Sequence, residues 1–242
     1  MLYLYLGGVR DYGQYCPIAL GSEVLADRWT PLILREMVLG STRFNDIERG
    51  LPGISRSLLV QRLRHLERKE AVERRPAASG RGSEYHLTPA GQDLGGVVMS
   101  LGEWAVRWKL AEPEPEEVDP RALTWWMHLR MDEDLLPDRR VVIEFAYQAP
   151  RIQIWIVVDR GDASVCAQHP GFDSDLVVRT DAVSMARVFS GLTTLRQATA
   201  DGAIELLGPP ELVRGFGRWF LWSPFRPAVQ AQLAERGTLS RR

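Results

Sequence analysis

Residues 54–75 constrain the fold of this 242-residue chain more than any other stretch. Within it, Leu59, Leu63 and Leu66 are spaced i, i+4 and i+7, which places them on one face of an α-helix. Ser55 precedes this pattern at the position of an N-cap, where its hydroxyl accepts a hydrogen bond from a backbone N–H group. The pattern predicts an amphipathic helix with one face toward a core and the other toward solvent or a partner.

The polar face of this helix carries side chains suited to nucleic acid. Residues 54–86 contain eight Lys and Arg residues and four Glu residues, and are the most basic stretch of the chain. Basic groups pair with phosphate oxygens, and Arg and Gln side chains pair with base edges. Taken alone, a solvated helix without a partner explains the charges equally well. The helix residues expected to contact DNA are Ser55, Arg56, Ser57, Val60, Gln61 and Arg64.

The segments on either side predict a helix-turn-helix followed by a wing. Helices are expected over 17–27, over 30–39 with Thr30 as N-cap, and over 42–49, before a tight turn at Leu51-Pro52-Gly53. Strands are expected over 72–75 and 83–87, joined by a loop rich in turn-forming residues. A short helix, a turn and a polar-faced helix is the helix-turn-helix order. The wing residues expected to reach phosphate or the minor groove are Arg74, Arg75 and Arg81.

A further helix is predicted from Thr88-Pro89 to about Leu110. It has more apolar residues than a single terminal helix leaves in water. The same helix of a second subunit is the most economical partner. The residues expected in this dimer contact are Leu94, Val97, Val98, Leu101, Trp104 and Trp108.

Several short motifs occur in order between residues 12 and 110. They are Tyr15-Cys16-Pro17-Ile18, Asp27-Arg28-Trp29-Thr30-Pro31-Leu32-Ile33-Leu34, Arg43-Phe44-Asn45-Asp46-Ile47, Leu51-Pro52-Gly53-Ile54-Ser55, the leucines from Leu59 to Leu66, and Tyr85-His86-Leu87-Thr88. Together they resemble the HxlR family of bacterial winged helix-turn-helix regulators. The resemblance implies a homodimer that binds double-stranded operator DNA. The family usually has glycine near position 71, so Ala71 predicts a slightly different end for the preceding helix.

Cys16 begins the first predicted helix. A helix N-terminus lowers the pKa of a thiol, and some HxlR proteins sense oxidants or electrophiles through a cysteine at this place, so Cys16 is a candidate redox sensor. The alternative is a small buried core residue, the commoner role of a single cysteine. Cys16 and Cys166 are the two cysteines of the chain, and neither has metal-ligand spacing, so no metal site is predicted.

Charge divides the chain into two parts. Residues 1–111 contain 15 Lys and Arg and 12 Asp and Glu, a net charge of +3, whereas residues 112–242 contain 15 and 19, a net charge of −4. Proline and glutamate over 112–120 predict a stiff, extended linker. We therefore expect a DNA-binding and dimerisation domain over 1–111 and a second domain with different partners over 121–242.

The second domain is predicted to be α+β with a mostly antiparallel sheet. Strands are expected over 140–147, 151–158, 163–168 and 175–180, and residues 123–131 fit either a strand or a helix. Two helices, a strand over 203–207 and a last helix that includes Phe220 follow. This order, with Asp175-Leu176-Val177-Val178-Arg179-Thr180-Asp181 and Asp201-Gly202-Ala203-Ile204-Glu205-Leu206, resembles the sterol-carrier-protein-2-like fold over about 120–222. That resemblance implies an apolar tunnel for lipids or other hydrophobic ligands.

Aromatic residues are abundant in the second domain and are candidates for lining a ligand cavity. A filled core explains the same composition equally well. The residues expected to contact a small hydrophobic ligand are Trp125, Phe145, Phe189, Phe216, Trp219 and Phe220.

The expected function is a dimeric, cytoplasmic transcriptional regulator that a small hydrophobic ligand modulates. Phosphate loops, dinucleotide fingerprints and catalytic serine motifs are missing from the sequence, so neither an enzyme nor a cofactor is expected. No apolar run reaches the ~18–20 residues of a membrane span. Two alternatives remain: a lipid or acyl carrier or enzyme-associated protein in which DNA binding is secondary, and a regulator whose second domain is only an interaction module.

Overall fold

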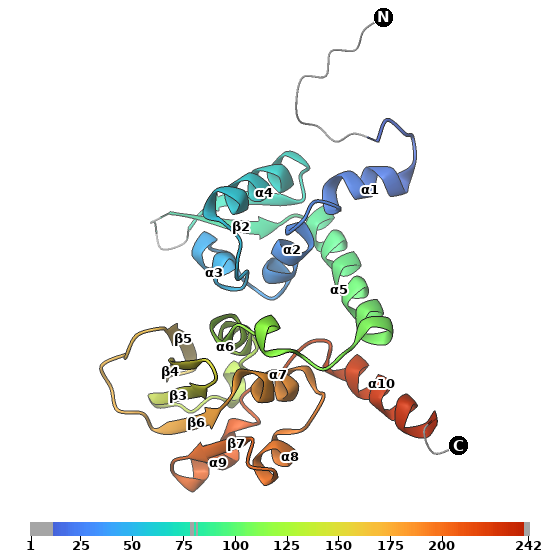
Figure 1. Ribbon diagram of the computed structural model, residues 1–242. Helices are drawn as coiled ribbons and strands as arrows, with labels where there is room; N and C mark the ends of the chain where they lie inside the picture. The colour runs from blue at the N-terminus through green and yellow to red at the C-terminus, as the bar shows by residue number, and fades with distance from the viewer. Residues whose placement is uncertain (1–11, 78–79, 81, 240–242) are drawn as a thin grey trace, which may run out of the picture. The chain divides into compact units, whose positions relative to one another are not determined.

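The computed structural model describes residues 12–77, 80 and 82–239, which form two compact units (Figure 1). The first comprises the chain up to Glu48 together with Gly53–Val98. The second comprises Arg49–Pro52 and Met99–Arg242. The long helix α5 (Pro89–Lys109) therefore contributes its first half to one unit and its second half to the other.

The first unit is a winged helix, as the sequence predicts. Four helices precede a two-stranded hairpin and then α5. The bounds are α1 (Pro17–Leu25), α2 (Thr30–Val38), α3 (Phe44–Arg49), α4 (Arg56–Arg68), β1 (Val72–Pro76) and β2 (Ser83–Leu87). The core contains the predicted leucines: Leu59, Leu63 and Leu66 of α4 are at most 1% exposed, as are Ile33 and Ile47.

Local hydrogen bonds fix where these helices begin. Ser55 is the N-cap of α4, and its hydroxyl accepts from the backbone N–H of Leu58 at 3.3 Å, as predicted. Thr88 likewise accepts from the N–H of Gly91 at 3.1 Å at the start of α5. The prediction of Thr30 as the N-cap of α2 was wrong. The chain turns at Trp29, whose φ is +78°, so that Trp29 is the N-cap and Thr30 is the first helical residue.

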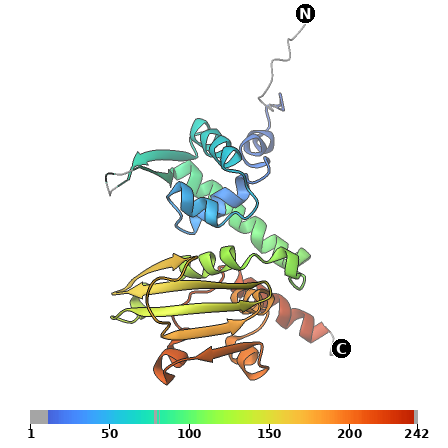
Figure 2. The same ribbon diagram turned by 60° about the vertical axis from the view of Figure 1, so that its left-hand side comes forward.

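The end of α4 explains how the chain accommodates alanine at position 71. The helix stops at Arg68, and Glu70 adopts the left-handed conformation with φ +57°. Glycine adopts this left-handed conformation most readily, but here Glu70 adopts it, one residue before Ala71. Ala71 is then 3% exposed and enters the hairpin, whose strands pair from Val72↔Leu87 to Pro76↔Ser83. In Figure 2 the hairpin extends away from α3 and α4.

The second unit is an α+β domain around a five-stranded sheet in the order β5-β4-β3-β6-β7. Its strands are β3 (Val141–Gln148), β4 (Arg151–Asp159), β5 (Asp162–Cys166), β6 (Leu176–Thr180) and β7 (Ile204–Leu207). The pairing of β3 with β6 is parallel and the other three pairings are antiparallel, so the sheet is mostly antiparallel as predicted.

Five helices accompany this sheet. They are α6 (Pro120–Leu129), α7 (Ala182–Ser190), α8 (Leu195–Ala200), α9 (Pro210–Phe216) and α10 (Arg226–Leu239). The first four contribute side chains to the core that packs on the sheet, whereas α10 lies against α7. Ile143 and Phe145 of β3, Ile156 of β4, Met127 of α6 and Met185 of α7 belong to one fully buried cluster. Alternate residues of β3 face this cluster because successive side chains of a strand point to opposite faces.

One segment that the sequence left open is resolved, and two others differ from the predictions. Residues 123–131 lie mostly in helix α6 and not in a strand, and Asp119 caps this helix through the N–H of Arg121 at 2.7 Å. The last predicted helix ends at Phe216, and Phe220 instead forms an antiparallel bridge with Met131. Helix α10 was not predicted, because its alternation of Ala, Gln and Arg lacks a clear apolar stripe.

The predicted extended linker contains local structure. Residues Pro115–Glu117 form the 3₁₀ turn η1, in which the N–H of Glu114 donates to the Glu117 carboxylate at 3.1 Å. Glu112 forms an ion pair with Arg187 of α7 at 3.1 Å. A second 3₁₀ turn, η2 (Glu133–Leu135), follows α6.

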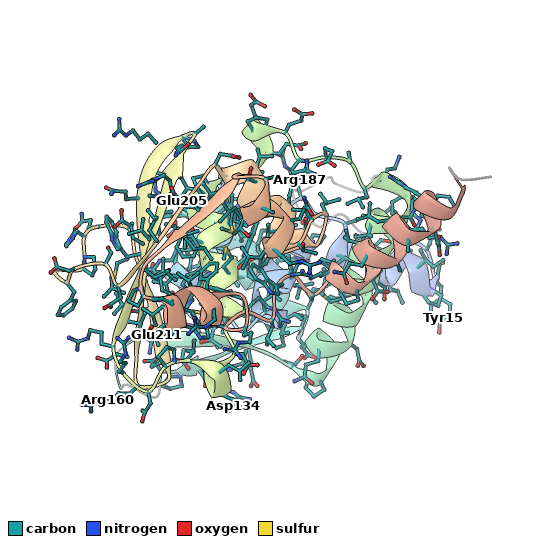
Figure 3. All side chains as sticks on the ribbon, turned by 90° about the horizontal axis from the view of Figure 1, so that it is seen from below. Tyr15, Asp134, Arg160, Arg187, Glu205 and Glu211 are labelled. Carbon is teal, nitrogen blue, oxygen red and sulfur yellow. The ribbon has the colours of Figure 1, made fainter. Side chains whose placement is uncertain are left out.

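Charged side chains lie around the outside of the second unit. Figure 3 shows Asp134, Arg160, Glu205 and Glu211 at its periphery, and all four are exposed. In the part of the chain that the structure describes, no helix combines the length and the apolar character that crossing a membrane requires.

Candidate nucleic-acid interface

The exposed face of α4 carries the residues that the sequence predicts at DNA. Ser55, Arg56, Ser57, Gln61 and Arg64 are exposed, and Val60 is half-buried among them. Ser57, Val60, Gln61 and Arg64 line one shallow hollow together with Arg56 and with Phe44 of α3. The helix-turn-helix geometry thus presents a face with donors, an acceptor and one apolar side chain.

Arg56 is held in place by α3. Its guanidinium donates to Glu48 at 2.7 Å and to the amide oxygen of Asn45 at 3.2 Å. It also lies 4.9 Å from the centre of the Phe44 ring, a cation–π arrangement. The Glu48 carboxylate offsets the charge of Arg56, and the contacts with Glu48, Asn45 and Phe44 join α4 to α3. Arg56 therefore has a structural role in addition to its predicted DNA contact. The sequence predictions did not include Phe44, Asn45 and Glu48 in the interface, since only the crossing of α3 and α4 brings them there.

The other arginines of α4 differ in what they contact. Arg62 forms an ion pair with Asp27, and both side chains are mostly buried, at 21% and 24% exposure. Arg64 is exposed and has no ion pair among residues 12–77, 80 and 82–239. Its charge is therefore available to a polyanion, whereas that of Arg62 is used within the fold.

The wing adds basic groups beside α4. Arg74 is exposed on β1 and lies 6.0 Å from the ring centre of its cross-strand partner Tyr85. Arg75 is also exposed and pairs with Glu73. Arg81 was predicted at the wing tip and lies outside the described residues. The backbone on either side closes the loop through the N–H of Ala77 and the carbonyl of Gly82, 3.2 Å apart.

Four apolar side chains form a stripe along α5. Val97, Leu101, Trp104 and Trp108 are spaced i, i+4, i+7 and i+11, and are 54, 49, 52 and 62% exposed. Leu94 is half-buried, and Val98 is only 7% exposed because it packs within the chain. Of the six predicted dimer residues, four therefore form this exposed stripe, and Leu94 and Val98 are partly or fully buried within the chain.

The aromatic residues predicted at a ligand mostly pack against one another or the sheet. Phe145 and Phe216 are fully buried with ring centres 6.1 Å apart, and Phe216 also contacts Trp219 and Phe220. Trp125 is 5% exposed, and Phe189 is half-buried at the border of the core. Sequence alone did not distinguish these packed rings from a cavity lining.

Cys16 is the N-cap of α1 in an extended conformation, and its side chain is partly exposed. The described residues hold no group of three His, Cys, Asp or Glu side chains that would suit a metal ion. The predicted redox role of Cys16 stays a prediction.

A short α3, a turn, the exposed face of α4 and an adjoining hairpin define the class of winged helix-turn-helix DNA-binding proteins. The family model of the HxlR-like helix-turn-helix matches residues 24–113. A relative described as the HTH-type transcriptional regulator YvaP of Bacillus subtilis is 36% identical over 101 residues, which cover 40% of this chain and 93% of YvaP. The chain therefore belongs to the HxlR-like helix-turn-helix family of transcriptional regulators.

Other similar proteins match the same part of the chain. The HTH-type transcriptional regulator Mb3122 of Mycobacterium bovis is 38% identical over 107 residues, covering 44% of this chain and 66% of that protein. The solved structure of the reduced transcriptional regulator YodB of Bacillus subtilis is 32% identical, with a TM-score of 0.35, over 40% of this chain and 96% of YodB. The family match ends at residue 113, so it does not extend to the five-stranded sheet.

Proposed function

We propose that this DNA-binding regulator acts as a homodimer in which α5 holds two copies of α4 against successive major grooves. The exposed stripe of Val97, Leu101, Trp104 and Trp108 carries the proposal, because two tryptophans more than half exposed on one helix face favour a partner surface. A two-fold dimer presents two equivalent recognition helices to half-sites about one helical turn, ~34 Å, apart. The partner of the proposed dimer is operator DNA, and its predicted location is the cytoplasm.

The oligomeric state of the full chain tests this proposal. Wild-type protein at micromolar concentration is expected to sediment as a dimer, and Trp104→Glu as a monomer, because a carboxylate buried in an apolar contact has no compensating partner. Glu103→Gln is the matched control, since Glu103 is exposed on the same helix but lies outside the stripe. A monomeric wild type, or a dimeric Trp104→Glu variant, would contradict dimerisation through this stripe.

We also propose that residues 121–242 modulate DNA binding through a small hydrophobic ligand rather than through catalysis. The order of strands and helices that resembles the sterol-carrier-protein-2-like fold supports this proposal. Phe145 and Phe216 are fully buried in the core of the domain, so the proposed ligand lies beside Phe189, which is half-buried at the border of that core. An interaction module with a completely filled core is the alternative, and a binding measurement separates the two.

A further inference from the structure

One apolar side chain stands on the polar face of α4. Val60 is half-buried, whereas Ser57, Gln61 and Arg64 around it are exposed. The core face of the helix is already complete, because Leu59, Leu63 and Leu66 are at most 1% exposed. Val60 is therefore not needed to bury α4. A polar residue at this position would expose less apolar surface to water, and that exposure is unfavourable.

The surroundings of Val60 form a small apolar depression. Phe44, the first residue of α3, is half-buried and lines the same hollow as Val60. The Arg56 guanidinium lies over the Phe44 ring and is fixed by Glu48 and Asn45, so one rim of the hollow is held in position before DNA arrives. Gln61 and Arg64 form polar parts of the same surface.

We propose that this hollow receives the C5-methyl group of a thymine in the major groove and that Val60 is a specificity-determining residue. The proposal rests on the proposed contact of α4 with operator DNA. Thymine is the base that presents an apolar group in the major groove, and apolar side chains are its complement. The neighbouring Gln61 and Arg64 offer the groups that pair with adenine and guanine, so the surface fits a short sequence with thymine beside polar base edges.

The expected effect is modest and measurable. Removing one buried methyl group from a contact costs about as much as exposing one methylene, which corresponds to roughly three- to five-fold in affinity. Deoxyuridine in place of thymidine removes only that methyl group and leaves base pairing unchanged. The DNA thus supplies a perturbation that cannot affect folding of the protein.

The experiment first selects duplexes from a random library with the full-length protein. Each thymidine of the selected site is then replaced by deoxyuridine, and the dissociation constants of wild-type, Val60→Ala and Arg64→Ala proteins are measured. We expect one thymidine per half-site whose replacement weakens wild-type binding three- to five-fold. The same replacement should have no effect in Val60→Ala and keep its full effect in Arg64→Ala.

Each result decides between the alternatives. If Val60 only packs against Phe44, Val60→Ala weakens binding to both duplexes equally, and the methyl effect persists. If no thymidine is sensitive in the wild type, the proposal is wrong even when DNA binding by α4 holds. If no duplex is selected at all, the proposed operator binding is wrong, and so is the thymine contact that depends on it.

Discussion

Gly91 shows how a single residue positions α5 against the hairpin. A Cβ atom at Gly91 would lie 1.9 Å from the carbonyl oxygen of Ala71, which also accepts from the N–H of Thr88 at 3.1 Å. The absence of a side chain therefore permits the close approach of helix and strand. Gly96 lies on the same helix, and a Cβ atom there would meet no other atom within 4 Å.

These two glycines give opposite predictions for stability. Gly91→Ala should lower the free energy of unfolding by ~1–3 kcal/mol, the usual cost of overpacking, because the Ala71 backbone has to move. Gly96→Ala should raise it by ~0.5–1 kcal/mol, because alanine loses less conformational freedom in a helix. Urea denaturation of the full chain measures both, and equal effects would show that the close contact does not matter.

Tyr147 predicts a pH dependence for the second domain. Burial raises the pKa of its phenol well above the ordinary value, and the Thr124 hydroxyl 2.8 Å away lowers it by less. Thr124 donates to the carbonyl of Pro120 at 2.7 Å, which leaves Tyr147 as the donor to Thr124. Because the folded state keeps this proton and the unfolded state loses it near pH 10, stability is fully present below pH ~10 and falls as the pH rises further.

Comparison with Tyr147→Phe isolates this effect. Between pH 10 and 11 the wild type should lose up to ~1.4 kcal/mol more unfolding free energy than the variant, because one proton separates the two states. At pH 8 the variant should lose about 1 kcal/mol or less, since Thr124 retains Pro120 as its partner. Parallel stability curves from pH 8 to 11 would show that Tyr147 ionises equally in both states.

At the scale of elements, α4 divides its arginines between the fold and the solvent. Arg62 points toward α1 and α2 and pairs with Asp27 between them. Arg56 joins α4 to α3 through Glu48 and Asn45. Arg64 remains exposed on the face proposed to meet DNA. The number of basic residues on a recognition helix therefore overstates the number of phosphates that it neutralises.

The salt dependence of DNA binding measures this division. Each neutralised phosphate contributes ~0.9 to the slope of log K against log salt concentration. Arg64→Ala should reduce the slope by about that amount if Arg64 contacts phosphate. Arg62→Ala should leave the slope unchanged and lower the stability of the fold instead. A flattened slope in Arg62→Ala would mean that its ion pair with Asp27 opens on DNA.

At the scale of the whole molecule, a family winged helix with net charge +3 over residues 1–111 is joined to a segment with net charge −4 over residues 112–242. The acidic excess lies in the connecting residues 112–120, because residues 121–242 carry 15 Lys and Arg and 14 Asp and Glu. The nearly neutral second domain lacks the basic excess that attracts DNA. Its charged residues Asp134, Arg160 and Glu205 are exposed, and its apolar residues form a continuous core. This arrangement suits a regulatory domain that biases DNA binding through a ligand or a partner.

Titration of the full chain with a fluorescent fatty acid, with and without selected operator DNA, tests the regulatory role. We expect saturable binding that Phe189→Trp weakens, and a change of ~5- to 150-fold on adding DNA, which is the usual range of coupling between two sites. Leu221→Trp is the control, because Leu221 is exposed and lies outside the aromatic core. No saturable binding would favour the interaction module, and binding unaffected by DNA would exclude a sensor.

The sequence by itself determined the elements of the winged helix. The spacing of Leu59, Leu63 and Leu66 and the cap at Ser55 act within one helix, so local pattern predicted α4 and its buried face. Likewise, short apolar runs between turns predicted the strands, and the order of strands and helices predicted the mostly antiparallel sheet. Both follow because helix and strand periods are properties of neighbouring residues.

Only the tertiary structure decided which side chains are used inside the fold. Val98 has the same apolar character as Val97, yet it packs inward while Val97 stays exposed. The rings of Phe145 and Phe216 contact each other although 71 residues separate them in the chain, and Phe44 and Glu48 reach Arg56 only because α3 crosses α4. Such contacts depend on how elements pack, because side chains far apart in sequence compete for the same volume, and no local pattern records that competition.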